Sequence, residues 1–130
     1  MTNSANPSGV AGRTAAMVVA ARTPTERDFP ASTFATQFER HRIDFLVDRG
    51  EELVSQGDIL AARILLQRAA EAGDARAAFA LGGTYDPIML AILRARIDAD
   101  VGLASKWYKK ARDLGSRDAQ ERLKVLASLH

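Results

Sequence analysis

The chain contains no cysteine, which excludes a disulfide framework and any thiolate site. It has two histidines in 130 residues, and its net charge is only +2. The longest clearly apolar run near the start, Ala15 to Ala21, is too short to span a bilayer and has only Arg13 as a positive flank. These absences exclude a small disulfide-stapled domain. They predict a chain with no membrane span, in the cytoplasm by default.

The charges are unevenly distributed. Residues 1–40 carry four arginines against three acids, residues 41–99 seven arginines against nine acids, and residues 100–130 seven lysines or arginines against four acids. All four lysines lie in this last segment. Because the bias is much weaker than that of a dedicated nucleic-acid-binding protein, we expect no nucleic-acid partner.

Composition also divides the chain into two parts. Residues 1–33 are rich in Ser, Thr, Asn, Pro and Gly and show no regular period, so they are predicted to form a flexible or disordered tail. Residues 34–130 are predicted to form one all-α domain, because apolar residues recur at helical spacing and nothing alternates with period two. Thr36 and Glu39 have the spacing of a capping box, which predicts the start of the first helix.

Later helix ends are marked by capping residues and glycines. The Asp86-Pro87 pair is a start signal, because proline suits the first position of a helix, and it predicts a short helix over residues 88–96. The other expected boundaries are an end at Gly57, a cap at Asp58, an end at Gly73, a helix over residues 75–85, a cap at Asp100, an end at Gly115 and a cap at Ser116.

An internal repeat is the strongest signal in the sequence. Placing Gly73 over Gly115 gives an offset of 42 residues without gaps. With this offset Asp58, Ala62, Ala69, Ala77 and Leu81 fall on Asp100, Ala104, Ala111, Ala119 and Leu123. Small side chains at fixed helical spacing let two helices pack closely, so the repeat predicts a repeated helix crossing.

Two stretches carry a family resemblance. Ala78-x-x-Leu81-Gly82-x-x-Tyr85 resembles the first helix of a tetratricopeptide unit, and Ala104-x-x-x-Tyr108-x-x-Ala111 resembles the second. The run WYKKARDLGSRDAQ, which begins at Trp107, resembles the related Sel-one-like repeats.

The resemblance covers about Arg42 to Leu126 and implies a short α-solenoid of antiparallel helix pairs. Its units would cover about residues 42–73 and 74–115, with a truncated capping unit at 116–130. The second unit carries an insertion of ten residues. The positions expected to pack the helices together are Leu46, Gly50, Leu53, Ala62, Leu66, Ala69, Leu81, Gly82, Tyr85, Ala104, Trp107, Tyr108, Ala111, Gly115, Ala119 and Leu123.

The two adjacent aromatics of the KWYKK run could stack on nucleic acid or be buried. At 100° per residue, Trp107 and Tyr108 face away from Lys106, Lys109 and Lys110. A nucleic-acid platform needs rings and cations on one surface, so we expect buried rings and a solvated lysine face.

No catalytic constellation can be assembled. His41, Asp44 and Asp48 share one helical face, but the other histidine is the terminal His130, which leaves too few ligands for a metal site. There is no phosphate-binding loop and no nucleophile elbow. The chain is therefore predicted to be a non-enzyme without a cofactor.

The predicted function is a non-catalytic protein-interaction module. The resemblance implies that first helices line a concave surface, on which Asp44, Glu51, Arg76 and Phe79 would face a protein or peptide ligand. Apolar residues outside the repeat stripes, Leu60, Ile64, Met89 and Leu90, need a cover that is either another part of the chain, a partner or a second copy. The alternative function is a small bacterial secreted effector, in which the tail is an uncleaved leader for a specialised secretion system.

Overall fold

The structure is a computed structural model that describes residues 31–129, with side chains from residue 33 onward. The chain divides into two compact units, residues 1–40 and residues 41–130. Most of the predicted tail, and the secretion leader predicted within it, lies outside the described residues.

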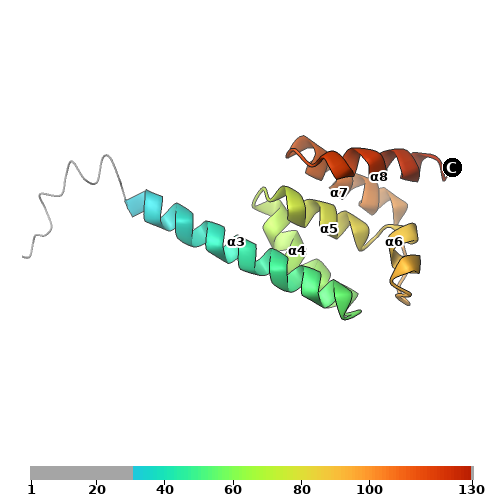
Figure 1. The fold of residues 1–130 in the computed structure, drawn as a ribbon, viewed down its shortest axis with the longest axis horizontal. Coiled ribbons are helices and arrows are strands. Elements are labelled where there is room, and N and C mark those ends of the chain that lie inside the picture. The colour runs from blue at the N-terminus through green and yellow to red at the C-terminus, as the bar shows by residue number, and fades with distance from the viewer. Residues whose placement is uncertain (1–30, 130) are drawn as a thin grey trace, which may run out of the picture. The chain divides into compact units, whose positions relative to one another are not determined.

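Every regular element among residues 31–129 is a helix, which confirms the all-α prediction for this part of the chain (Figure 1). The helices are α3 (Ala31–Ser55), α4 (Ile59–Glu71), α5 (Ala75–Gly83), α6 (Pro87–Ile92), α7 (Val101–Asp113) and α8 (Arg117–Ala127). None of these helices is both long enough and apolar enough to cross a membrane.

The start of α3 differs from the prediction. The helix begins at Ala31, so Thr36 and Glu39 lie inside it and do not form its N-terminal capping box. Residues three apart are neighbours on any helical face, so the same spacing also occurs within helices.

The starts of the later helices follow the local signals. The side chains that accept a hydrogen bond from a backbone amide at a helix start are those of Asp58, Asp74, Asp86, Asp100 and Ser116. Gly115 was expected to pack at a helix crossing, but it is exposed and a Cβ there would touch nothing within 4 Å. Its φ of 109° is a left-handed conformation that suits glycine, so Gly115 ends α7 and does not pack it.

The core lies between neighbouring helices of residues 41–130. Helix α5 packs against α4 and α7, and α7 packs against α8. Of the predicted packing residues, those that are buried are Gly50, Leu53, Ala62, Leu66, Ala69, Leu81, Gly82, Ala104, Trp107, Tyr108, Ala111 and Ala119. Leu46, Tyr85 and Leu123 are half-buried and pack against this core.

Two helix crossings are close enough to require glycine. A Cβ on Gly50 would lie 2.7 Å from Cγ of Leu66, and a Cβ on Gly82 would lie 2.6 Å from Cδ1 of Tyr108. In each case a long side chain of the later helix occupies the space over a glycine of the earlier one. Both glycines therefore bring a helix pair together.

The segment predicted to be the insertion, which begins at Asp86-Pro87, is tied to the core at both ends. The predicted helix over residues 88–96 is shorter in the structure, because α6 ends at Ile92 and Arg94 adopts a φ of 56°. Beyond it, the backbone amide of Asp100 donates to the carbonyl of Tyr85 over 2.8 Å. Arg63 of α4 covers the Tyr85 ring, with its guanidinium carbon 3.8 Å from the ring centroid. These contacts of Tyr85 and Asp100 hold the two ends of the segment against the rest of the domain.

Candidate functional site

Five segments of residues 41–130 converge on one groove of about 220 Å³. It is lined by Glu51 and Val54 of α3, Phe79, Ala80 and Gly83 of α5, Met89 and Leu93 of the insertion, Tyr108 of α7 and Arg122 of α8. We call this set the groove. A site to which separate elements each contribute a wall has a defined shape, so the groove is the candidate functional site.

The walls of the groove are mostly apolar. Phe79 and Tyr108 pack as tilted rings, with centroids 5.4 Å apart and an interplanar angle of 44°. Gly83 leaves space between them and the insertion, because a Cβ there would lie 3.7 Å from the Tyr108 hydroxyl and 3.9 Å from Cγ of Met89. Met89 and Leu93 are four residues apart and so lie on one side of the insertion. An apolar side chain is therefore the natural occupant.

Charges at the rim are paired within the chain. Arg76 of α5 donates to both carboxylate oxygens of Glu51, over 2.8 and 3.1 Å, and it also pairs with Asp48. The hydrogen bonds that Arg76 donates to Glu51, and then to Asp48, raise the pKa of Arg76, although burial opposes them. This cluster joins α3 to α5 and leaves no net positive charge at that rim.

The other rim depends on a fully buried carboxylate. Asp86 is 0% exposed, and its Oδ2 accepts hydrogen bonds from the Tyr108 hydroxyl over 2.8 Å and from Nε and Nη2 of Arg122 over 3.2 and 2.5 Å. Its Oδ1 accepts from the backbone amides of Ile88 and Met89 over 2.8 and 3.3 Å. One side chain thus caps α6, fixes a ring of the groove and holds the arginine of α8.

Burial and hydrogen bonding act in opposite directions on this cluster. Burial raises the pKa of Asp86, but the donors of Arg122, Tyr108 and the Ile88 amide outweigh it and hold the pKa below its ordinary value. Burial, followed by the hydrogen bond to Asp86, raises the pKa of Tyr108. Burial lowers the pKa of Arg122, but its hydrogen bonds to Asp86 and Tyr108 outweigh that effect. The carboxylate is therefore charged and the phenol neutral at neutral pH.

The structure brings several of the predicted partner-binding residues together. Glu51, Phe79 and Met89 line the groove, and Arg76 pairs with Glu51 at its rim. Asp44 is exposed on α3 and does not line it.

Three predicted residues lie elsewhere. Leu60 and Ile64 are exposed on α4 and also lie outside the groove. Leu90, for which the sequence left a partner open as the cover, is 3% exposed, so the chain itself covers it and the prediction that it contacts a partner is wrong. The physical reason is the cap: Asp86 binds the amides of Ile88 and Met89, which fixes the rotation of α6 and turns Leu90 inward.

Sequence reasoning missed Asp86 and Arg122 as members of the site. Asp86 was interpreted only as a helix cap, and Arg122 was counted only among the basic residues of the last segment. They are 36 residues apart in the chain, and no local pattern joins them. The one available signal was a hydroxyl at Tyr108, because a buried phenol usually needs a hydrogen-bond partner.

The polar groups of the groove are already engaged with one another. The carboxylate of Asp86 is saturated by donors, and the Tyr108 hydroxyl donates to it. No group of three metal-ligating side chains occurs within the described part of the chain. What the lining offers is an apolar surface with fixed walls, which is suited to binding.

Comparisons of the chain with models of protein families, with curated proteins and with solved structures found no match.

Proposed function

We propose that the chain is a short α-solenoid of antiparallel helix pairs, resembling Sel-one-like and tetratricopeptide repeats, that acts as a non-catalytic protein-interaction module. Two contacts support the repeat: Leu66 over Gly50, and Tyr108 over Gly82. Gly82 follows Gly50 by 32 residues and Tyr108 follows Leu66 by 42, and the difference of ten equals the insertion inferred from the sequence. Two homologous units, one of which carries an insertion between its two helices, would produce two such equivalent helix crossings.

The observation that carries the binding function is the groove. Its volume of about 220 Å³ lies below the roughly 300–1,000 Å³ typical of small-molecule and cofactor sites. A space of this size, lined by Val54, Phe79, Met89 and Leu93, fits one large apolar side chain. The occupant is therefore a segment of a protein partner that inserts such a side chain, as an anchor residue does at the centre of an interface.

The ion pairs at the rim of the groove indicate which chemical properties this partner needs. Glu51 is paired with Arg76, and Arg122 with Asp86, so neither rim charge calls for an opposite charge on the ligand. Shape and apolar contact select the occupant, and salt has little effect on its affinity.

A titration followed by NMR tests this proposal. The ¹⁵N-labelled protein is titrated with the peptide acetyl-Gly-Ser-Phe-Ser-Gly-amide and with the matched peptide that has alanine in place of phenylalanine. We expect the phenylalanine peptide to shift the amide signals of Val54, Phe79, Gly83 and Met89, and the alanine peptide to shift them far less. Equal shifts with both peptides, or none at the groove, would contradict the proposal.

A variant that fills the groove gives the matched control. At Gly83 a Cβ makes only ordinary contacts, at 3.7 and 3.9 Å, so Gly83→Leu places a side chain in the groove without a backbone clash. Ala91→Leu adds the same side chain at an exposed position of α6 that does not line the groove. We expect Gly83→Leu to abolish the peptide-induced shifts and Ala91→Leu to keep them, with both proteins folded.

A further inference from the structure

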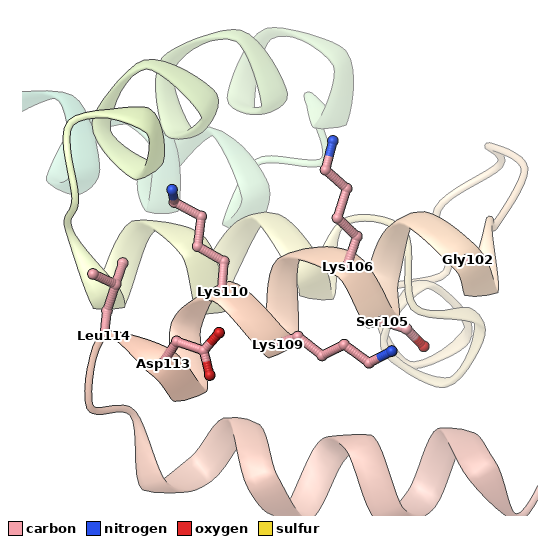
Figure 2. Close-up of a pocket in the computed structure, with 7 residues that line it drawn as sticks. All are labelled: Gly102, Ser105, Lys106, Lys109, Lys110, Asp113 and Leu114. Atoms are coloured by element: carbon pink, nitrogen blue, oxygen red, sulfur yellow. The ribbon is translucent and has the colours of Figure 1, made fainter.

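A second surface, separate from the groove, runs along the outer face of α7. It is a shallow depression of about 550 Å³, lined by Gly102, Ser105, Lys106, Lys109, Lys110, Asp113 and Leu114 (Figure 2). We call it the lysine trough. All of its lining residues belong to α7 and its C-cap, and none lines the groove. It is therefore an independent feature of the molecule.

The trough carries positive charge that no carboxylate of residues 33–129 neutralises. Among residues 33–129, Lys124 is the one lysine in an ion pair, with Glu121 over 3.5 Å, so Lys106, Lys109 and Lys110 have none. The single carboxylate of the trough, Asp113, is paired with Arg112 over 3.1 Å. Three ammonium groups within little more than one turn thus remain available to an anionic partner.

The shape of the trough favours an elongated occupant. Figure 2 shows Lys106 and Lys110 extending to the same side of α7, while Lys109 leaves the helix in a different direction. From Gly102, which has no side chain, to Leu114 the helix axis rises about 18 Å, at roughly 1.5 Å per residue. The ammonium of Lys106 lies 5.1 Å from the centroid of the Trp107 ring, a cation–π contact that favours one position of the charge.

We propose that the lysine trough binds an acidic segment of a partner protein, whose carboxylates meet Lys106, Lys109 and Lys110. Opposite charges that face each other across an interface steer association and fix its register. Lysine is suited to this role because its ammonium is a mobile point charge that adapts to carboxylates at several spacings.

Other anionic partners fit the surface less well. Nucleic acid gains affinity from rings that stack on bases, but Trp107 is 6% exposed and Tyr108 is buried. An anionic membrane is typically bound by clusters of about 4–8 basic residues together with apolar anchors, whereas the trough has three lysines and one partly exposed leucine, Leu114. A short acidic peptide needs neither stacking rings nor membrane anchors.

The test compares three probes at about 50 mM salt: a fluorescein-labelled peptide of ten glutamates, a 20-nucleotide single-stranded DNA, and vesicles of phosphatidylcholine with 30% phosphatidylserine. The trough variant is Lys106→Gln, Lys109→Gln and Lys110→Gln together. The control variant also removes three positive charges, by Arg96→Gln, Arg117→Gln and Lys124→Gln together, all at exposed positions outside the trough.

We expect the wild type and the control to bind the glutamate peptide with similar affinity, which falls as salt rises. The trough variant should bind it about tenfold more weakly, since each exposed charge contact contributes a few-fold in affinity. Tighter binding to DNA or to vesicles than to the peptide, equal weakening in both variants, or no peptide binding by the wild type would each overturn the proposal. The phenylalanine-peptide titration of the groove should be unchanged in the trough variant, which separates the two surfaces.

Discussion

Removing the buried carboxylate of Asp86 should destabilise the domain more than removing any exposed cap. Asp86 is fully buried and paired with Arg122, whose side chain is 21% exposed. Asp86→Asn keeps an oxygen for the amides of Ile88 and Met89 but removes the charge. Asp86→Ala removes both the charge and the cap. The two variants therefore separate the ion pair from the capping interaction.

The expected loss in the free energy of unfolding follows from the interactions that each variant removes. Breaking a buried ion pair by removing one partner costs about 3–5 kcal/mol. Because Arg122 is partly exposed, it can regain water, so we expect the low end, about 3 kcal/mol, for Asp86→Asn. Loss of the cap adds about 1 kcal/mol, so Asp86→Ala should cost about 4 kcal/mol. Such losses are a large part of the total stability of a small domain.

Urea unfolding, followed by circular dichroism at 222 nm, measures these costs. Asp58 is the matched control, because it is an exposed cap that accepts from the Ala61 amide without an ion pair. Asp58→Asn should be nearly neutral. A cost for Asp86→Asn no larger than that for Asp58→Asn would refute the stabilising role of the buried pair.

The pH dependence provides a second check on Asp86. Because its pKa is lowered in the folded state, its contribution is present above the unfolded pKa of about 3.9 and is lost as pH falls through the folded pKa. The difference between wild type and Asp86→Asn should therefore shrink in acid, below about pH 4. A difference that stays constant down to pH 2 would contradict this assignment.

Four further predictions concern residues of the core. Gly82→Ala should lower the free energy of unfolding in urea by about 1–3 kcal/mol, because its Cβ meets the Tyr108 ring, which the Tyr108 hydroxyl holds in place. Gly50→Ala should cost less, because its Cβ meets Leu66, which can change rotamer, and equal costs would contradict this reasoning. Ala111→Leu, at a fully buried position, should cost about 1–3 kcal/mol and lower Tm, and an unchanged Tm would place Ala111 outside a helix crossing. Because the pKa of Tyr108 is raised in the folded state, its contribution to stability is present below the unfolded pKa of about 10 and is lost as pH rises through the folded pKa. The wild type should therefore lose more stability in alkali than Tyr108→Phe, and parallel stability profiles would contradict this prediction. Native emission of Trp107 should be blue-shifted and move to the red in urea, whereas emission like that of free tryptophan would mean an exposed ring.

Local signals explain why most of the helix ends could be predicted. Asp58, Asp100 and Ser116 cap helices where the sequence placed them, since capping depends on only three or four neighbouring residues. The same locality explains the error at the start of α3. The pair Thr36 and Glu39 has capping-box spacing in the middle of a long helix, and spacing alone does not distinguish the two positions.

Burial was predictable where a helix has one apolar stripe. Trp107 and Tyr108 face the core because the opposite side of α7 carries lysines. Helix α6 has no polar stripe to oppose an apolar one, so its sequence does not indicate which residue faces inward. The cap at Asp86 decides this by fixing the rotation of the helix, and it buries Leu90 while Met89 lines the groove.

The buried cluster follows from the insertion once the two proposed units are compared. Leu66 in the first unit occupies the place that Tyr108 occupies in the second, and each lies over a glycine of the preceding helix. Leucine has no hydroxyl, so a carboxylate buried beside it would lack that donor, and the first unit has no insertion to cap. In the second unit the insertion begins at Asp86, whose second oxygen must be satisfied in the core, and the hydroxyl of Tyr108 and the guanidinium of Arg122 satisfy it. The other two side chains therefore depend on Asp86, because its removal would take away the acceptor of both the Tyr108 hydroxyl and the Arg122 guanidinium at the base of the groove.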